Sequence, residues 1–205
     1  MAGDEVLAFR VVLSRATVTI VDVGMSRGLD AVLSRTGASL AVNGGFFTPD
    51  TLPEGLAVSG GRELSAKSLE LGGGVVTVAR GRARLFAVED YAPPEGLDSA
   101  VQCRPRLVVS GVQHVKKDDG RGAERTALCL REGGSVLEVV VARGPEGGRG
   151  PTLSAWAGLL VARGCEEALN LDGGPSTGVA WREGGAIQAV APRAGVRHAI
   201  VVSTE

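Results

Sequence analysis

The 205-residue sequence has few aromatic residues, few cysteines and no large excess of charge of either sign. Phe, Trp and Tyr make up 3% of the residues, so a core has to be built mainly from Val, Leu, Ile and Ala. The formal net charge of −1 argues against nucleic acid as the main partner. No apolar run is long enough to predict a membrane span. Residues 1–5 lack the basic start of a signal peptide, so we expect a cytoplasmic protein or one whose export signal was removed.

The three cysteines, Cys103, Cys129 and Cys165, are too widely spaced to form a CxxC pair. A zinc site is therefore not predicted. Because their number is odd, at least one thiol has to be unpaired. Cys129 lies in an apolar segment, and we expect it simply to be buried.

Motifs of several common enzyme classes are also missing. There are two histidines, His114 and His198, and no GxSxG sequence, so a Ser-His-Asp hydrolase has little support. The phosphate-binding loop G-x-x-x-x-G-K-[ST] does not occur, and no GxGxxG links a strand to a helix. Nucleotide hydrolysis by a phosphate loop and dinucleotide binding therefore have no sequence signal.

Glycine and short apolar segments dominate what the sequence does contain. The 31 glycines are spread as turn pairs, which is typical of many short strands joined by tight turns. The length suits one domain over residues 1–205, and the connection at residues 144–151 is too short to separate two domains. Strands outnumber helices without strict alternation, so we expect the α+β class, with a strand-rich mixed or antiparallel sheet and a few packed helices.

The clearest helix is predicted at residues 153–163, between Thr152 as its N-cap and Gly164 as its end. A second helix begins near Leu29 and ends at Gly37. The glycine-punctuated segment 56–84 predicts a β-meander, whereas segments 48–55, 91–99 and 116–122 predict loops. Further strands are expected at residues 7–13, 16–23, 39–42, 106–110, 112–115, 125–130, 136–142, 168–171, 178–181, 186–190 and 198–203.

One candidate site follows the apolar segment 168–171, which opens into Asp172, Gly173 and Gly174. A carboxylate at the end of a buried strand is where scaffolds tend to present functional groups. Asp172 is therefore a candidate nucleophile, general base or metal ligand. The alternative is a plain turn, because Asp-Gly is a common turn dipeptide.

A second stretch with the same pattern runs from Ala41 and Val42 into Asn43, Gly44 and Gly45. Asn43 is a candidate to bind a sugar hydroxyl or a phosphate oxygen, or simply a residue that tolerates a turn. The backbone N–H groups of the glycines in both stretches are candidates to bind an anion. Those glycines are Gly44, Gly45, Gly173 and Gly174.

Arg125 begins an apolar strand, where its planar guanidinium is a candidate phosphate clamp. The alternative is an ordinary ion pair at the rim of the protein. Ser176 and Thr177 are candidates to hydrogen-bond a ligand, or else turn hydroxyls. Phe46, Phe47, Trp156 and Trp181 lie in or near the glycine-rich segments, as core residues or as a stacking surface for a sugar.

Four motifs occur in an order that resembles the phosphodiester glycosidase family. They are Asn43-Gly44-Gly45-Phe46-Phe47, Arg106-Leu107-Val108, Arg125-Thr126-Ala127 and Asn170-Leu171-Asp172-Gly173-Gly174-Pro175-Ser176-Thr177, and the helix at residues 153–164 matches as well. Two departures stand out: Arg104-Pro105 replaces a usual Gly-Pro, and His198 stands where the family often has Asn. Both departures affect the expected sugar pocket.

The resemblance implies a hydrolase that cleaves a sugar-1-phosphate diester at the anomeric carbon, acting on a bacterial glycan or exopolysaccharide. It implies that Asn43, Arg125 and Asp172 are catalytic. It also implies that Ser176 or Thr177 binds substrate, beside the glycines of both stretches. A sugar phosphate or glycan is then the partner.

Three questions stay open from the sequence. Glu54 and Glu124 are equal candidates for a second carboxylate. We expect no required cofactor, but Ca²⁺ or Mg²⁺ held by the oxygens of Asp172 and Asn43 is an alternative. A non-catalytic carbohydrate-binding or cell-wall-binding module on the same fold is the main rival, and a β-rich structural domain is the third reading.

Overall fold

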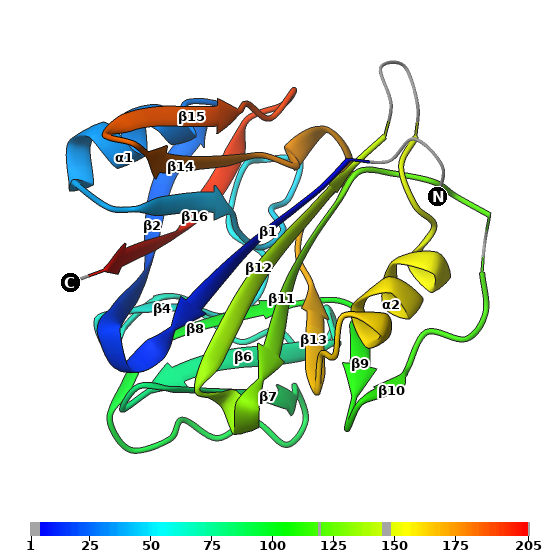
Figure 1. Cartoon of the computed structure of the whole chain (residues 1–205). Helices are drawn as coiled ribbons and strands as arrows, with labels where there is room; N and C mark the ends of the chain where they lie inside the picture. The colour runs from blue at the N-terminus through cyan, green and yellow to red at the C-terminus, as the bar shows by residue number, and fades with distance from the viewer. Residues whose placement is uncertain (1–4, 119, 145–148, 205) are drawn as a thin grey trace.

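The computed structural model describes residues 5–118, 120–144 and 149–204. Within these residues, sixteen strands and two α-helices follow one another along the chain (Figure 1). The helices are α1 (Leu29–Thr36) and α2 (Leu153–Ala162). The strands are β1 (Glu5–Val12), β2 (Ala16–Ser26), β3 (Leu40–Asn43), β4 (Ala57–Ser59), β5 (Arg62–Ser65), β6 (Gly74–Ala79), β7 (Arg82–Ala87), β8 (Leu97–Cys103), β9 (Arg106–Val109), β10 (Val112–Gln113), β11 (Arg125–Arg131), β12 (Val136–Arg143), β13 (Glu167–Asn170), β14 (Val179–Glu183), β15 (Ala186–Val190) and β16 (Val196–Thr204).

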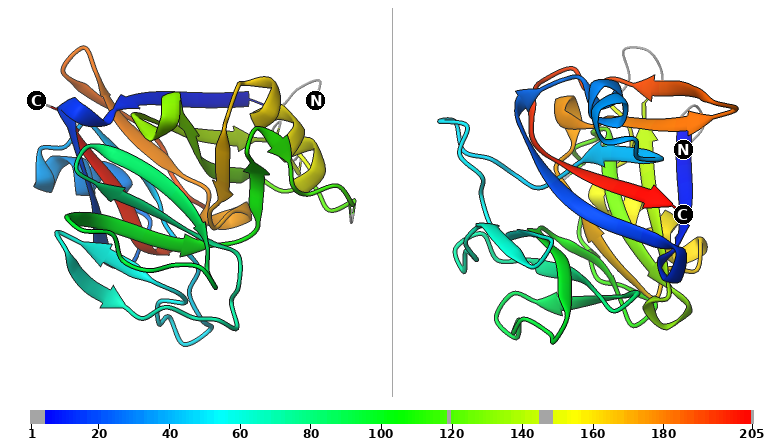
Figure 2. Two further views of the ribbon diagram at one scale, coloured as in Figure 1. Left: turned by 90° about the horizontal axis from the view of Figure 1, so that it is seen from below. Right: turned by 90° about the vertical axis from the view of Figure 1, so that its left-hand side faces the viewer.

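The described strands form three antiparallel sheets (Figures 1 and 2). The first sheet has the order β1-β12-β11-β13-β9-β10, and the second has the order β15-β14-β3-β16-β2. The third sheet has the order β5-β4-β8-β6-β7. The predicted strand-rich α+β class is confirmed, and the sheets are antiparallel.

One apolar core lies between the three sheets, and aliphatic side chains fill most of it. Each sheet contributes the side chains on its inner face, because residues that alternate along a strand point to opposite faces. The partly buried Phe9, Phe46 and Trp181 pack against its margin. Typical core residues are Leu128, Leu137 and Val139 from the first sheet, Val42 and Ile200 from the second, and Val76 and Val101 from the third.

The two helices cover the outer faces of the first and second sheets. Trp156, Ala157 and Leu160 of α2 are buried against the first sheet, and α1 buries its apolar face against the second. Thr152 Oγ1 accepts a hydrogen bond from the N–H of Ala155 at 3.3 Å, so the predicted N-cap is confirmed. Gly37 also has the predicted role, since its N–H donates to the carbonyl of Leu33 at 2.9 Å at the end of α1.

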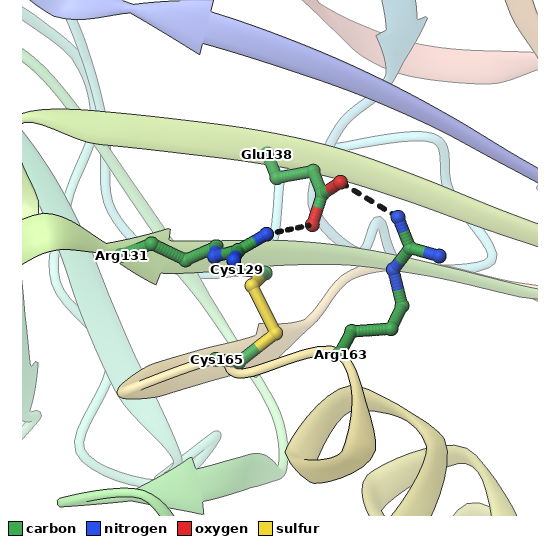
Figure 3. The surroundings of a disulfide bond; sticks show 5 residues. All are labelled: Cys129, Arg131, Glu138, Arg163 and Cys165. Carbon is green, nitrogen blue, oxygen red and sulfur yellow. Dashed lines mark hydrogen bonds and ion pairs between the residues drawn. A yellow bond between two sulfur atoms is a disulfide. The ribbon is translucent and has the colours of Figure 1, made fainter.

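A disulfide between Cys129 and Cys165 corrects our expectation that Cys129 is only buried. It joins β11 to the segment between α2 and β13, and Cys103 is the cysteine that stays free. Next to the disulfide, the buried Glu138 carboxylate contacts Arg163 at 2.7 Å and Arg131 at 3.8 Å (Figure 3). The two cysteines are 36 residues apart, so only the pairing of β11 with β13 brings them together.

The predicted β-meander at residues 56–84 is wrong, because β8 lies between β4 and β6 in the third sheet. β8 also begins inside the segment 91–99, which we expected to be a connection. Polar residues hide this central strand in the sequence. One of them, Gln102, is buried and donates from Nε2 to the carbonyls of Ser68 at 2.6 Å and Gly72 at 3.0 Å.

The loops predicted at residues 116–122 and 144–151 contain positions 119 and 145–148, which lie outside the described residues. In the part of the chain that the structure describes, no helix has the length and apolar character needed to cross a membrane.

Candidate active site

The two glycine-containing stretches that we singled out in the sequence lie side by side. We call residues 43–45 the Asn43 stretch and residues 172–174 the Asp172 stretch. The Asn43 stretch ends β3 in the second sheet, and the Asp172 stretch follows β13 in the first. Asn43 Nδ2 donates to the carbonyl of Asp172 at 2.7 Å, and the N–H of Asp172 donates to the carbonyl of Gly44 at 3.2 Å. The fold therefore joins two sheets at this point.

Asn43 is completely buried and works as a hydrogen-bonded link. Its Oδ1 accepts from Thr126 Oγ1 at 2.8 Å and from the N–H of Gly178 at 3.2 Å. Three chain segments are thus tied to one amide. Because both lone pairs of the amide oxygen are used, Asn43 has no acceptor left for a cation or a substrate hydroxyl.

Asp172 is half-buried at the wall of a cleft of about 480 Å³. The N–H of Gly173 donates to its Oδ1 at 2.9 Å, and the Ser176 hydroxyl also bonds to this carboxylate. Burial raises the pKa of Asp172, and the bonds from Ser176 and Gly173 partly oppose that rise. A carboxylate in such surroundings is poorly solvated and aimed at the cleft, which suits reaction with an electrophile.

Two arginines share the cleft with Asp172. Arg125 is held in place, because its Nε donates to the carbonyl of Pro151 at 3.2 Å and its Nη2 to the carbonyl of Arg121 at 2.9 Å. These two bonds hold the guanidinium at the lining of the cleft through backbone carbonyls. Phe46 and Leu153 form apolar parts of the same cleft.

Arg104 is the charged lining residue that we did not include among the sequence-predicted site residues. Its backbone is fixed, since its carbonyl accepts from Asn170 Nδ2 at 3.0 Å and the next carbonyl, of Pro105, accepts from the N–H of Asn170 at 3.0 Å. Its exposed guanidinium makes no hydrogen bond or ion pair with any residue that the structure describes. The sequence feature that could have identified Arg104 is Arg104-Pro105, which departs from the family pattern. We had related this departure only to the shape of the sugar pocket.

The glycine N–H groups are mostly used inside the protein, so the predicted anion cradle is not formed as we expected. The N–H of Gly44 donates to the carbonyl of His198, and that of Gly174 to the carbonyl of Glu124, both at 2.8 Å. The N–H of Gly173 binds the Asp172 carboxylate. The remaining glycine, Gly45, is buried, and a Cβ there would come within 3.2 Å of the carbonyl oxygen of Gln102. Gly44, Gly45 and Gly173 permit close backbone approach, whereas Gly174 has open space around it and a φ of +58°.

The two hydroxyls after the Asp172 stretch have different surroundings, although both are buried. Ser176 bonds to the Asp172 carboxylate and so reaches the site indirectly. Thr177 Oγ1 has no hydrogen-bond partner among the described atoms. Of the two hydroxyls, that of Ser176 is therefore the one in contact with the carboxylate.

The structure separates the two candidates for a second carboxylate. Glu124 is buried and lies 3.0 Å from Arg193 and 3.6 Å from Arg143, away from the lining of the Asp172 cleft. Glu54 is half-buried, and its N–H donates at 2.9 Å to the carbonyl of Phe46, which lines that cleft. Neither glutamate is among the lining residues of that cleft, and the Glu124 carboxylate is held in ion pairs with two arginines.

Two further buried groups have shifted pKa values. Burial raises the pKa of the free Cys103 thiol, and the negative charge of Asp172 raises it further. Burial lowers the pKa of His198, whose Nε2 has no partner among the described residues. Asp22 raises the pKa of His198, and Arg197 lowers it. Among the described residues, no group of three or more His, Cys, Asp or Glu side chains is arranged to hold a metal ion.

The sequence model described as phosphodiester glycosidase matches residues 36–203. No curated protein matches the sequence significantly. Among solved structures, the zebrafish N-acetylglucosamine-1-phosphodiester alpha-N-acetylglucosaminidase catalytic domain, auto-inhibited by its pro-peptide, superposes with a TM-score of 0.74 and 14% identity. That match covers 98% of this chain and 83% of the zebrafish chain.

Two bacterial structures are also similar. A hypothetical protein from Synechocystis has a TM-score of 0.70 and 16% identity over 98% of this chain, which spans only 59% of that longer protein. A protein from Burkholderia pseudomallei has a TM-score of 0.66 and 16% identity, with 97% of this chain and 73% of the other chain covered. At these identities the superpositions establish a shared fold.

Proposed function

The chain belongs to the phosphodiester glycosidase family, and we propose that it is a hydrolase that cleaves the anomeric C–O bond of a sugar-1-phosphate diester. The products would be a free sugar and a phosphomonoester. The observation that carries the proposal is the composition of the Asp172 cleft, which combines one poorly solvated carboxylate with the guanidiniums of Arg104 and Arg125.

This composition matches the needs of the reaction. A phosphate is already a good leaving group, so protonation by a strong general acid is less important than in the hydrolysis of an ordinary glycoside. The departing phosphate needs cationic donors that are in place before the bond breaks. Arg125 is held by two carbonyls and Arg104 has a fixed backbone, so both can meet the phosphate with little reorganisation.

Asp172 has the role of the carboxylate at the anomeric carbon, either as the nucleophile or as the base that activates water. Asn43 is a positioning residue in this proposal, because it holds the Asp172 backbone from a buried site. We propose that no resident cofactor is required, since Asp172 and the two arginines supply the charge that the reaction uses. Turnover that survives prolonged dialysis against a chelator would support this part, and loss that Ca²⁺ or Mg²⁺ restores would overturn it.

The substrate that we propose is a sugar phosphate within a bacterial glycan or exopolysaccharide. The apolar surfaces of Phe46 and Leu153 in the cleft suit the apolar face of a sugar ring. Support would come from screening sugar-1-phosphate diesters of nitrophenol. Cleavage at the anomeric carbon releases nitrophenyl phosphate, which gives colour only after phosphatase treatment, whereas cleavage at the nitrophenol oxygen gives colour directly.

The decisive test is hydrolysis in heavy-oxygen water. The proposal predicts that the label enters the anomeric hydroxyl of the sugar and not the phosphate. Arg125→Lys keeps the positive charge but loses the planar fork, so turnover should fall sharply in a folded protein. Label in the phosphate would overturn the glycosidase mechanism, and full turnover by Arg125→Lys would remove Arg125 from the catalytic residues.

One observation favours a second function, a non-catalytic carbohydrate-binding module. Asp172 is the one carboxylate among the residues that line the cleft, and the glycine N–H groups beside it are already used. A binding module would bind sugar phosphates equally well with Asn in place of Asp172 and would show no turnover in the wild type. Turnover of any diester that depends on Asp172 would exclude it.

A further inference from the structure

A second cleft adjoins the candidate active site. It has a volume of about 520 Å³, and Glu124, Arg149, Gly174 and Arg193 are among its lining residues. Glu124 and Gly174 line this cleft, whereas their chain neighbours Arg125 and Gly173 line the Asp172 cleft. The two clefts therefore share a wall that is formed by two short segments, Glu124-Arg125 and Gly173-Gly174. A substrate longer than one sugar phosphate can reach both.

The charge in the second cleft is mainly positive. Its carboxylate, Glu124, is only 6% exposed and is held in the wall by Arg193 at 3.0 Å and Arg143 at 3.6 Å. Arg193 nevertheless keeps 58% of its side chain exposed, so it can offer further donors to the cleft. The side chain of Arg149 is exposed and forms no hydrogen bond or ion pair within the described part of the chain. The whole sequence has a net charge of −1, so the excess of positive charge is a feature of this cleft and not a property of the whole chain.

The backbones that carry these two arginines are firmly placed. Close beside Arg149, the N–H of Ala123 donates to the carbonyl of Pro151 at 3.2 Å. A Cβ on Gly150 would lie 2.5 Å from the Ala123 carbonyl oxygen, which shows how closely the two segments approach. The N–H of Arg193 donates to the carbonyl of Pro175 at 2.8 Å, in the turn that follows the Asp172 stretch. Both arginines therefore line the second cleft from backbone that is held in place.

We propose that Arg149 and Arg193 form a second anion-binding subsite, which takes a phosphate or carboxylate of the substrate other than the phosphate at the scissile bond. Guanidinium groups bind both kinds of anion through paired N–H donors. The substrate class is then a sugar phosphodiester that carries at least one more negative group. The additional group lies either on the acceptor or on the sugar, as in a uronic acid. The assignment of one anion to the Asp172 cleft rests on the proposed function.

The first test measures binding without turnover. Calorimetry would compare alkanediol bisphosphates of increasing chain length with the matching monophosphates on the full chain. One bisphosphate should bind at least about tenfold more tightly than its monophosphate, and this advantage should shrink as the salt concentration rises. Equal binding of bisphosphates and monophosphates at every length would overturn the subsite.

Variants make this test specific. Arg149→Ala keeps the Cβ and every described backbone bond, so it should fold and lose most of the bisphosphate advantage. Arg193→Gln should also reduce that advantage, while Arg143 still contacts Glu124 in that variant. Arg62→Ala is the matched control, because it removes an exposed arginine from β5 in the third sheet. A full bisphosphate advantage in the folded Arg149→Ala, Arg193→Gln double variant would overturn the assignment.

The second test uses turnover to identify where the additional charge lies. Three diesters would be compared: one with a neutral acceptor, one with a phosphate on the acceptor and one whose sugar is a uronic acid. At least one charged diester should have a kcat/KM about tenfold higher than the neutral diester, mainly through KM, and the gap should close in Arg149→Ala. Turnover of all three with equal kcat/KM would overturn the subsite. If no diester is hydrolysed, the proposed function fails, and the bisphosphate measurements alone decide on the subsite.

Discussion

The Asn43 stretch and the Asp172 stretch have the same sequence pattern, an apolar strand that runs into a polar residue and two glycines, yet they do different work. Asn43 is fully buried and ties together the carbonyl of Asp172, the hydroxyl of Thr126 and the N–H of Gly178. Asp172 is half-buried and faces a cleft with two arginines. The same local pattern therefore gives a structural link at the end of a strand in the second sheet. In the first sheet it gives the group that we propose to be reactive.

What separates the two stretches is their depth in the molecule and not their composition. Both stretches follow strands with neighbours on both sides, β3 between β14 and β16 and β13 between β11 and β9, but every residue of β3 is buried, including Asn43. The Asp172 stretch follows β13, and the Asp172 side chain is only half-buried, so it reaches solvent. Substitutions at matching positions should consequently change different properties, stability at the first stretch and turnover at the second.

The largest effect that we expect is at Asp172. Asp172→Asn should lower turnover by a factor on the order of a thousand, or about 4 kcal/mol of transition-state free energy, because the amide can neither attack carbon nor take a proton. The melting temperature should stay the same or rise, because burial penalises the charged form of this carboxyl. Turnover and calorimetric melting would be measured on the same preparation. An active Asp172→Asn protein would move the carboxylate role to Glu54 or another residue.

The next largest effect is expected at Asn43, where substitution should lower stability instead of acting on turnover alone. Asn43→Ala removes three hydrogen bonds and leaves buried groups without partners, so the free energy of unfolding should fall by about 3 kcal/mol. Denaturant unfolding would measure this loss. Thr126→Val, which removes only one member of the same group, is the graded control and should cost less. If Asn43→Ala lost turnover with unchanged stability, Asn43 would be catalytic and the contrast between the stretches would be wrong.

The sequence predicted those features that depend on neighbouring residues. The N-cap at Thr152, the end of α1 at Gly37 and both strand-to-glycine stretches are set by local chemistry, and each is present. Features that depend on contacts between distant segments were missed. The place of β8 in the third sheet, the Cys129–Cys165 disulfide and the exposed guanidinium of Arg104 in the cleft are of this kind.

The site shows the same limit. Sequence reasoning selected Asn43, Arg125 and Asp172, and the fold brings all three segments together. It could not tell that the N–H groups of Gly44, Gly173 and Gly174 are occupied by internal carbonyls and by the Asp172 carboxylate. Two of these acceptors, the carbonyls of Glu124 and His198, lie in other parts of the chain. Nor could it separate Glu54 from Glu124, since only the ion pairs of Glu124 with Arg143 and Arg193 do so.

A smaller effect should appear in the pH profile. An ordinary Asp side chain has a pKa of about 3.9. Burial raises the pKa of Asp172, so the carboxylate that the reaction needs becomes protonated at a higher pH than in an ordinary Asp. The acid limb of kcat/KM should therefore lie above that value, with about tenfold loss for each further pH unit. The Ser176 hydroxyl lowers the pKa of Asp172, so Ser176→Ala should move the acid limb to higher pH. Thr177→Val, at the neighbouring buried hydroxyl, should leave the limb in place, and an equal shift in both variants would contradict this role of Ser176.

The smallest effect separates the glycines of the two stretches by mechanism. A Cβ on Gly44 would lie 2.9 Å from the Cβ and 3.0 Å from the carbonyl oxygen of His198, so Gly44→Ala should cost about 2 kcal/mol of stability through overpacking. Gly174 has open space around it, but its φ is +58°, so Gly174→Ala should cost only about 1 kcal/mol through backbone strain. Asn tolerates this left-handed conformation, so Gly174→Asn should recover part of that loss, whereas Gly44→Asn should be worse than Gly44→Ala. Thermal melting of the four variants would show whether the Asn variant is more stable than the Ala variant at position 174 and less stable at position 44. If the Ala and Asn variants had the same order of melting temperatures at both positions, the two stretches would respond to substitution alike, and their depth in the molecule would not distinguish them.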